Sequence, residues 1–385
     1  MIDTLDTFLE SKPLYYKEID HDRVHIAYRQ LKPHIKQPRT IHIVGTNGKG
    51  STGRMIAHLA FKSGLRVGHY SSPHILKFNE RIWINGVDCS DEVLQSAHQK
   101  LFIILGQKMS ESLSYFEYTT LLAFIVFEPC DLMVLEAGLG GEFDATNVCD
   151  KELSIITPIG LDHQAFLGDT IEEIAATKIR SIQNNALVAP QIFNEVYNIA
   201  KKIANEKGTK IHFSKDTSHL YIKNVGGVVL AKGWADYLID NAIVAIQALE
   251  ILAIPYALVD LWELELFGRF YALTDNIRID VGHNALAAQA IVKELDAKVV
   301  LIYNVLEDKA YEEVLRILKP KVKSVEILPI YSGRAATVEA IEKALEKVGL
   351  AYSHFSNQID DDEKYLVFGS FYVVEEFLKR FYVPK

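Results

Sequence analysis

The sequence contains only three cysteines, Cys89, Cys130 and Cys149, among 385 residues. They are too few and too widely spaced to form a disulfide framework or a cysteine-rich metal site. Such sparse cysteine is typical of a protein that stays in a reducing compartment. We therefore expect a cytoplasmic protein.

Long hydrophobic segments are also absent. The longest apolar run, residues 121–127, is far shorter than the ~18 residues that a membrane-spanning helix needs. The first six residues carry acids where a secretory signal peptide carries basic residues, and no apolar stretch follows them. We therefore expect neither export by that route nor a membrane partner.

An excess of basic residues is missing as well. The chain has 41 Lys and Arg against 50 Asp and Glu, which gives a net charge of −9. A protein with this balance repels polyanions, so we expect no nucleic-acid partner. The 49% of hydrophobic residues is ordinary for a globular chain, and the length suggests two or three domains.

Six short apolar runs rich in Val and Ile alternate with segments of helical period. They are residues 41–44, 132–135, 154–157, 299–303, 325–328 and 365–368. Uniformly apolar runs separated by helices are typical of parallel sheets that helices cover on both faces. The sequence thus predicts an α/β fold, in which a P-loop-type, mainly parallel sheet domain precedes a smaller Rossmann-like α/β domain.

The domain junction is expected near Phe267. A helix-like stretch at 237–252 is followed by a turn at Pro255, and a fresh set of β and α segments begins after Phe267. This division gives domains 1–266 and 267–385. A cleft between two such domains is the default place for a ligand.

The strongest local motif is a glycine-rich loop between the run at 41–44 and a helical segment at 54–62. It reads Gly45-Thr46-Asn47-Gly48-Lys49-Gly50-Ser51-Thr52. Glycines let backbone N–H groups turn toward a phosphate, the helix N-terminus adds positive potential, and Lys49 supplies a point charge. The loop predicts a phosphate-binding site, with a plain glycine turn as the alternative. Because Gly50 separates Lys49 from the hydroxyl residues, a generic P-loop kinase or GTPase fits less well.

Two polar residues follow predicted strands at the edge where ligands bind in open α/β sheets. Glu136 ends the run at 132–135 and is either a Mg²⁺ ligand or a solvated carboxylate. His163 follows the run at 154–157, and a lone histidine is more often structural than a metal ligand. The sequence pattern leaves both alternatives open for each residue.

A lysine interrupts the apolar stripe of the next predicted helix. This helix is signalled by Thr170 and Glu173, which form a capping-box pattern. Lys178 occupies a position where helical spacing predicts another apolar residue. Its side chain either extends from the core to water or points into a nucleotide site.

A further cluster, Asp280-Val281-Gly282-His283-Asn284, lies between a predicted strand and a helix that begins near Ala285. Asn284 or a neighbour could simply cap that helix. Arg269, close to the predicted junction, could bind phosphates or form an ion pair between domains.

Together these motifs resemble the folylpolyglutamate synthase and dihydrofolate synthase family, the folate branch of the Mur ligase superfamily. The resemblance covers nearly the whole chain, and its segments follow the family's order. Besides the phosphate loop they are residues 70–74, 78–82, 115–119, 136–141, 144–147, 162–163, 167–168, 268–269, 280, 283–284 and 369–372. One such segment has little specificity, whereas seven or more in order are very specific.

The resemblance implies how ATP and metal ions bind. Lys49 and the loop amides would hold the ATP phosphates, and Ser72 and Glu136 would bind one Mg²⁺. His163 and Lys178 resemble the second metal site, where the family lysine is carbamylated. An unmodified ammonium is repelled by Mg²⁺, whereas a carbamate is the hard oxygen ligand that this ion prefers. The predicted cofactors are therefore ATP and two Mg²⁺ ions, with a carbamylated Lys178.

The substrate side is implied in the same way. Residues that resemble the family's grip on the nucleotide and the incoming glutamate are Asn241, Arg269, Asp280 and His283. Residues 114–119 resemble part of a pterin-binding surface, on which Phe116 is a candidate for stacking. The predicted substrate-binding residues are Phe116, Glu117, Asp144 and His283.

The predicted reaction is ATP-dependent amide formation between L-glutamate and dihydropteroate or a folylpolyglutamate. The substrate carboxylate would attack the γ-phosphorus of ATP to form an acyl phosphate, which the amine of glutamate then attacks. The residues predicted to be catalytic are Lys49, Lys178, His163, Arg269 and His283. We expect a monomeric enzyme with small-molecule substrates.

Two other functions stay open. A Mur-type ligase for another substrate is expected to place a separate domain before this core, and the 44 residues that precede Gly45 leave too little room for one. A P-loop ATPase module that forms no amide would hydrolyse ATP independently of glutamate.

Overall fold

The computed structural model describes residues 2–13, 20, 22–214 and 219–381. The chain divides into two compact units, and neither is continuous in sequence. Unit 1 comprises Met1–Ile159, Ile171–Tyr221 and Asn241–Leu264, and unit 2 comprises Gly160–Thr170, Ile222–Asp240 and Glu265–Lys385. The short segment that contains His163 therefore belongs to the same unit as the C-terminal third of the chain. The division into domains 1–266 and 267–385 stays a prediction.

Unit 1 is built on an eight-stranded sheet of order β4-β3-β2-β5-β1-β6-β7-β8. Its strands are β1 (Arg39–Val44), β2 (Val67–Tyr70), β3 (Ile82–Ile84), β4 (Val87–Asp88), β5 (Leu132–Glu136), β6 (Leu153–Ile156), β7 (Asn185–Val188) and β8 (Lys210–Phe213). The six strands from β2 to β8 in this order are parallel, and β3 and β4 add antiparallel pairs at one edge. Ile41, Ile43 and Val44 of β1 are fully buried, as is usual for a parallel strand covered on both faces.

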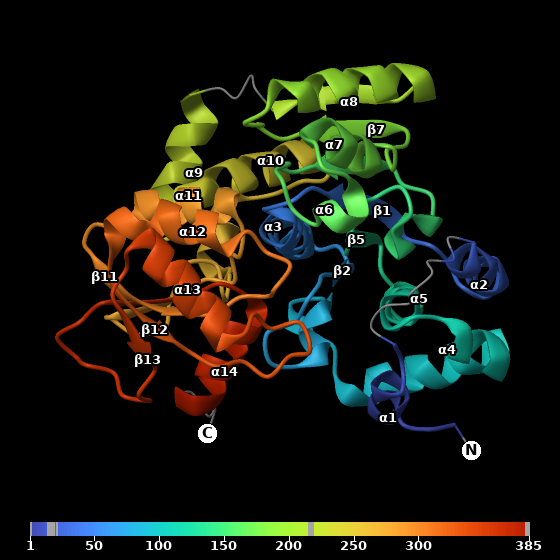
Figure 1. Cartoon of the computed structure of the whole chain (residues 1–385). Coiled ribbons are helices and arrows are strands. Elements are labelled where there is room, and N and C mark those ends of the chain that lie inside the picture. Colours follow the sequence, from blue (N-terminus) through green and yellow to red (C-terminus); the bar gives the residue numbers. More distant parts are fainter. Residues whose placement is uncertain (1, 14–19, 21, 215–218, 382–385) are drawn as a thin grey trace. The chain divides into compact units, whose positions relative to one another are not determined.

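Several helices of unit 1 pack on this sheet, and others pack on those helices (Figure 1). The helices of unit 1 are α1 (Leu5–Glu10), α2 (Arg23–Leu31), α3 (Lys49–Lys62), α4 (Asp91–Ser112), α5 (Tyr115–Phe127), α7 (Ile171–Ile179), α8 (Asn194–Lys207) and the larger part of α10 (Tyr237–Ile251). Helices α4 and α5 lie side by side, as do α7 and α8 (Figure 1). Side chains of α1, α2, α4 and α5 form a buried apolar cluster with residues of β2 and β5.

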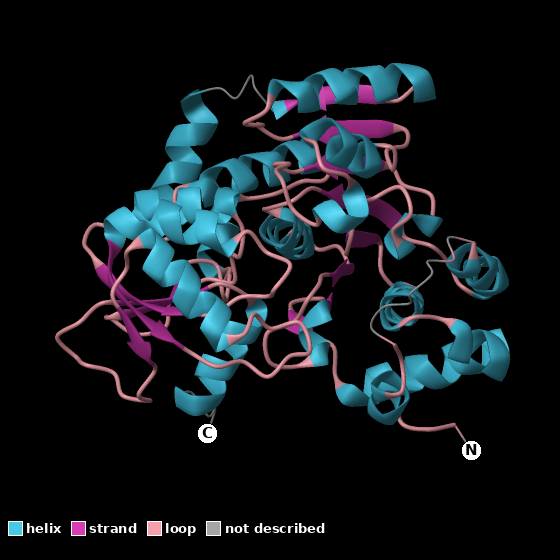
Figure 2. Cartoon of the chain, viewed as in Figure 1, coloured by secondary structure: helices cyan, strands magenta, loops and turns pink. Residues whose placement is uncertain are grey.

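Unit 2 has a six-stranded sheet of order β13-β12-β11-β14-β10-β9, in which only the β9–β10 pair is antiparallel among the described strands. Its strands are β9 (Tyr271–Ala272), β10 (Ile277–Ile279), β11 (Val299–Tyr303), β12 (Val322–Ile327), β13 (Tyr352–His354) and β14 (Tyr365–Phe368). Its helices are α6 (Gln164–Leu167), α9 (His219–Ala231), α11 (Ala285–Glu294), α12 (Tyr311–Leu318), α13 (Val338–Val348) and α14 (Phe371–Phe381). Helices α11, α12 and α13 form a neighbouring row (Figures 1 and 2).

All six predicted strands are present, with shifts of one to three residues at some ends. Helix α3 begins at Lys49, five residues before the predicted start, because the glycine-rich segment after Gly48 already has helical hydrogen bonds. Helices α7, α10 and α11 confirm the predicted helical segments. Among the described residues, no helix combines the length and the apolar character needed to cross a membrane.

Candidate active site

Two glycines of the phosphate loop are required by the space around them. A Cβ atom on Gly45 would lie 1.9 Å from Oγ1 of Thr157, and one on Gly48 would lie 2.8 Å from Oδ1 of Asn241. Gly48 also has a φ angle of 83°, a left-handed conformation that L side chains rarely adopt. The loop therefore turns tightly between β1 and α3, as the glycine pattern predicts.

The rest of the loop is fixed by hydrogen bonds. The amides of Thr46 and Asn47 donate to the carbonyl oxygen of Pro158, at 2.9 and 3.2 Å. The hydroxyl of Ser51 donates to the Gly48 carbonyl at 3.2 Å and accepts the Nδ2 amide of Asn241 at 2.9 Å. Asn241, predicted to bind the nucleotide, is thus buried directly beside the loop.

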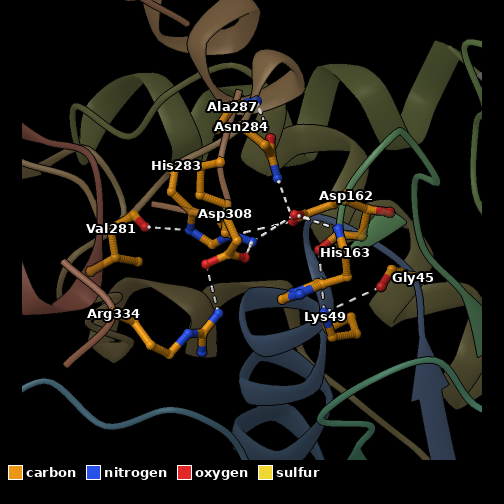
Figure 3. Close-up of polar contacts among 12 residues, drawn as sticks. Gly45, Lys49, Asp162, His163, Val281, His283, Asn284, Ala287, Asp308 and Arg334 are labelled. Atoms are coloured by element: carbon orange, nitrogen blue, oxygen red, sulfur yellow. Dashed lines mark hydrogen bonds and ion pairs between the residues drawn. The ribbon is translucent and has the colours of Figure 1, made fainter. Parts of the chain in front are cut away.

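Lys49 lies at the start of α3 with its ammonium turned back over the loop. It donates to the carbonyl oxygens of Gly45 and Thr46, at 3.3 and 3.2 Å (Figure 3). Its Nζ is 3.8 Å from Oε1 of Glu136, whose Oε2 accepts the backbone N–H of Ser72 at 3.3 Å. The structure therefore brings together three residues that the sequence predicted for phosphate and metal binding.

Oxygen groups at the end of β5 and in the first turn of α3 are of the kind that magnesium prefers. Glu136 supplies a nearly buried carboxylate, and the hydroxyl of Thr52, in the first turn of α3, is fully buried and has no hydrogen-bond partner in the described structure. Among the described residues, no cluster of three or more His, Cys, Asp or Glu could hold a metal ion. Mg²⁺ does not need such a cluster, because it commonly binds one or two carboxylates together with phosphate oxygens and water.

Lys178 on α7 also reaches the phosphate loop. Its side chain is buried, and its Nζ donates to the carbonyl oxygen of Gly45 at 2.9 Å. The close approach of α7 to the Gly138–Gly141 turn requires Gly141, because a Cβ there would lie 2.4 Å from the Lys178 carbonyl oxygen. The position is therefore not that of a surface lysine whose ammonium extends to water.

Phe116, the predicted pterin-stacking residue, lies near the carboxyl end of β5. A Cβ atom on Gly138 would lie 2.6 Å from the Phe116 ring, so the ring rests on a glycine two residues beyond Glu136. The ring centres of Phe116 and Tyr70 are 5.8 Å apart, and Phe116 is half-buried.

Two other predicted substrate-binding residues are engaged within the protein. Glu117 closes the N-terminal capping box of α5 and pairs with Arg23 at 2.7 Å. Asp144 is buried and accepts the amides of Leu139 and Thr146, at 2.8 and 3.0 Å. Burial raises the pKa of Asp144, and these hydrogen bonds oppose the shift. Glu117 thus orders the N-terminus of α5, and Asp144 orders the turn that contains Leu139.

Within unit 2, the carboxylate of Asp162 joins four other residues (Figure 3). Its Oδ1 accepts the Lys309 ammonium at 2.6 Å and the backbone N–H of His163 at 2.9 Å. Its Oδ2 lies 3.4 Å from Nε2 of His283 and 3.3 Å from Nδ2 of Asn284. Burial raises the pKa of Asp162, but the hydrogen bond from His283 and the nearby positive charges outweigh it, so the pKa lies well below its usual range.

Asp280 holds two turns of unit 2. It is buried, and its Oδ2 accepts the Phe270 amide at 2.7 Å and the Tyr237 hydroxyl at 3.2 Å, while Oδ1 accepts the Gly282 amide at 2.7 Å. Burial raises the pKa of Asp280, against the opposing charge of Arg269 and these hydrogen bonds. Asp280 therefore shapes the segments that carry Arg269 and His283.

Arg269, His283 and Asn284 are the remaining predicted residues in unit 2. The guanidinium of Arg269 lies 5.4 Å from the centre of the Phe371 ring. Nδ1 of His283 is 3.2 Å from the Val281 carbonyl oxygen, so both ring nitrogens have polar partners. Asn284 caps α11, as the sequence suggested.

Sequence reasoning missed Lys309 and Arg23 as partners of predicted site residues, and it named Asp162 only within a motif. Lys309 lies in the loop that follows β11, so its place beyond the carboxyl end of a buried strand was an available signal. Arg23 carries no comparable pattern, because its contact with Glu117 joins residues 94 positions apart.

The parallel sheet of unit 1 and the lysine-bearing loop after β1 define a nucleotide-dependent enzyme of the Mur ligase type, and residues 43–228 match the family of the Mur ligase middle domain. The chain is 30% identical to the dihydrofolate synthase/folylpolyglutamate synthase of Haemophilus influenzae, over 94% of both chains. It therefore belongs to the dihydrofolate synthase/folylpolyglutamate synthase family of ATP-dependent ligases.

Solved structures agree with this assignment. The crystal structure of Helicobacter pylori folylpolyglutamate synthetase is 40% identical, with a TM-score of 0.80 over 98% of this chain and 97% of that one. The bifunctional folylpolyglutamate synthase/dihydrofolate synthase of Yersinia pestis, complexed with AMPPNP and a Mn ion, is 26% identical, with a TM-score of 0.83 over 98% and 97%. That enzyme thus binds a nucleotide and a divalent metal.

Proposed function

We propose that this protein joins L-glutamate to dihydropteroate, to folylpolyglutamate or to both, with cleavage of ATP to ADP and phosphate. The observation that carries the proposal is the meeting of two lysines, Lys49 and Lys178, at the carbonyl oxygen of Gly45 in the phosphate loop. Family membership supplies the reaction class, Lys49 supplies a cationic group where the phosphates of ATP would bind, and Lys178 is the amine that carbamylation would turn into an oxygen ligand for a metal ion beside them.

The nucleotide would be held by the loop and its neighbours. We assign the phosphates to the loop of residues 46–52, through Lys49 and through the backbone N–H groups of residues 48–51 at the start of α3, with Asn241 supporting Ser51. The amides of Thr46 and Asn47 instead hold the loop to Pro158. Arg269 is a further candidate cation, and Asp280 accepts the amide of Phe270, the residue immediately after Arg269. Lys49 would neutralise charge on the transferring phosphoryl group, which is the main demand of this chemistry.

Divalent ions would bind beside the loop. We assign one Mg²⁺ to Ser72 and Glu136, whose contact supports a shared site. A carbamylated Lys178 is proposed to supply an oxygen ligand to a second ion, and the role of His163, which belongs to unit 2, stays a prediction from the family resemblance. When bound, Mg²⁺ supplies Lewis-acid stabilisation of the phosphate charges.

Each substrate has its own candidate residues. Phe116 would stack on the pterin, and Glu117 and Asp144 would fix the loops around it. His283 would hold the incoming glutamate. The pterin carboxylate attacks the γ-phosphorus and releases ADP, and the glutamate amine then attacks the acyl phosphate and releases inorganic phosphate. Catalysis of both steps would come from orientation of the reactants and from electrostatic stabilisation.

The proposal is tested by incubating the protein with Mg-ATP, L-glutamate and either 7,8-dihydropteroate or a reduced folate. Mass spectrometry should find a product heavier by one glutamyl residue, and phosphate release should require both the pterin and glutamate. Phosphate release that ignores both substrates would identify an ATPase module instead. A cytoplasmic, monomeric enzyme is part of the same proposal, and gel filtration checks the oligomeric state.

A further inference from the structure

Lys309 is a buried cation that the proposed reaction does not yet use. Its side chain is 5% exposed, and that of its partner Asp162 is 9% exposed. The 2.6 Å separation of Nζ and Oδ1 is that of a short, charge-assisted hydrogen bond. A second carboxylate, Asp308, lies 3.7 Å from the same ammonium and is itself paired with Arg334 at 2.8 Å. Lys309 therefore belongs to an ordered ionic network, and its geometry is fixed.

The carboxylate that Lys309 holds is shared by two histidines. Oδ1 of Asp162 accepts the backbone N–H of His163 at 2.9 Å, and Oδ2 faces Nε2 of His283 at 3.4 Å (Figure 3). Because the two oxygens are rigidly linked, a rotation of the carboxylate would change both contacts. The Lys309 ammonium opposes that rotation by occupying Oδ1 from the side of the β11 loop.

His163 needs such a restraint. Its φ angle is 55°, a left-handed conformation that is strained for a residue with a side chain. The bond to Asp162 fixes the N–H of this strained residue, while Gly160 contacts Leu286 of α11 so closely that a Cβ there would lie 2.3 Å from its side chain. The segment Gly160–Thr170 is thus held against the rest of unit 2 by the close packing of Gly160 and by the contacts of the Asp162 carboxylate.

We infer that Lys309 is a positioning residue for the ligase reaction, acting through Asp162 on the His163 turn and the His283 imidazole together. This inference rests on the proposed function for the roles of the two histidines. Through the single carboxylate of Asp162, Lys309 would orient both His283, which is predicted to bind glutamate, and His163, which is predicted to bind a metal ion. In this proposal Lys309 acts only through Asp162.

The test is a double-mutant cycle with Lys309→Met and Asp162→Asn in the full chain. Each single variant should raise the KM for glutamate about tenfold or more, and the double variant should be no worse than the poorer single one, because both changes break the same link. Hydrogen exchange of the peptide spanning 160–167 should become faster in Lys309→Met. Lys309→Arg, which keeps the charge, should recover part of the glutamate KM.

A matched control is Lys12→Met, which removes a lysine of similar burial. The Lys12 ammonium donates to the backbone carbonyl oxygens of Ser110, Glu111 and Leu113 and lies over the rings of Phe8 and Tyr118. Lys12→Met should lower the melting temperature and leave the glutamate KM unchanged. Multiplicative effects in the cycle, or an unchanged glutamate KM in Lys309→Met, would overturn the inference. If Lys309→Met does not fold, the inference is still tested by Asp162→Asn and Lys309→Arg. In these variants the hydrogen-exchange rate of the peptide 160–167 and the KM for glutamate are measured. A wild-type protein that makes no glutamylated product would refute the proposed function instead, and the exchange experiment would still test the contact.

Discussion

Nζ of Lys178 lies 2.9 Å from the carbonyl oxygen of Gly45, the residue that opens the phosphate loop. Helix α7 thus places a lysine, where its apolar stripe predicts a hydrophobic residue, against the backbone that turns between β1 and α3. A buried lysine is costly unless its ammonium is hydrogen-bonded or chemically changed. This contact makes Lys178 the residue whose removal is most informative.

We predict that Lys178→Ala lowers the rate of ligation by about a hundredfold or more, since it removes a preorganised group beside the transferring phosphate. Added acetate should restore part of the rate if a carbamate is the active form, because acetate can occupy the vacated space and supply an oxygen ligand. The rate is measured with and without acetate, and Lys202→Ala on the exposed face of α8 is the control. Unchanged activity in Lys178→Ala would remove the carbamate from the mechanism.

Gly48→Ala should weaken ATP binding and destabilise the fold. The added Cβ would meet Asn241 at 2.8 Å, and the left-handed backbone adds strain of about 1–3 kcal/mol. Gly227→Ala is a matched control, because this glycine lies within α9 with no atom near its Cβ position, and alanine there should stabilise the helix by up to about 1 kcal/mol. Calorimetry of nucleotide binding and chemical unfolding measure both effects. Equal changes in nucleotide affinity and in the free energy of unfolding for Gly48→Ala and Gly227→Ala would contradict the loop geometry.

Phe116→Ala should raise the KM for the pterin substrate about tenfold and leave the KM for ATP unchanged, because the ring lies on Gly138, whereas the Lys49 ammonium lies over the phosphate loop. Glu117→Gln should mainly lower stability, by about 1–3 kcal/mol, since it weakens the buried pair with Arg23 and the capping box. Steady-state kinetics in which each substrate is varied in turn measures the KM values, and chemical unfolding measures the loss of stability. An ATP-specific defect in Phe116→Ala would place the pterin elsewhere.

The three cysteines should resist thiol reagents in the native protein. Burial raises the pKa of Cys89 to about 11 and the pKa values of Cys130 and Cys149 to about 12, so the reactive thiolate is scarce at pH 8. Unfolded thiols have a pKa of about 8.5. The folded-state pKa values are higher than the unfolded one. The buried, protonated thiols therefore contribute fully to the stability of the fold below a pH of about 8.5, and this contribution is lost as the pH rises toward 12. Rapid labelling by Ellman's reagent at pH 8 without denaturant would contradict this burial.

The fold and the phosphate loop were predictable because they depend on local patterns. Uniform apolar runs specify buried parallel strands, and Gly45 and Gly48 occur where the backbone has no room for a side chain. The oddity of Lys178 was also visible, since a charged residue in an apolar stripe breaks helical periodicity. Its partner, the Gly45 carbonyl 133 positions away, was not, because a backbone oxygen has no sequence signature.

The predicted roles of Glu117 and Asp144 illustrate a different difficulty. Family resemblance identified them as substrate-binding residues, whereas their oxygens hold a helix N-terminus, an arginine and loop amides in this structure. A motif shows that a residue matters but does not separate direct contact from support of a neighbour. Lys309 shows the converse, because its importance comes only from a partner 147 positions away.

The central claim is that ATP activates the pterin carboxylate as an acyl phosphate before glutamate attacks. It is tested most directly with a pterin substrate whose carboxylate oxygens are labelled with ¹⁸O, in the presence of Mg-ATP and L-glutamate. The inorganic phosphate released should carry one ¹⁸O atom for each amide bond formed. Unlabelled phosphate, whether or not a glutamylated product accumulates, would contradict this account.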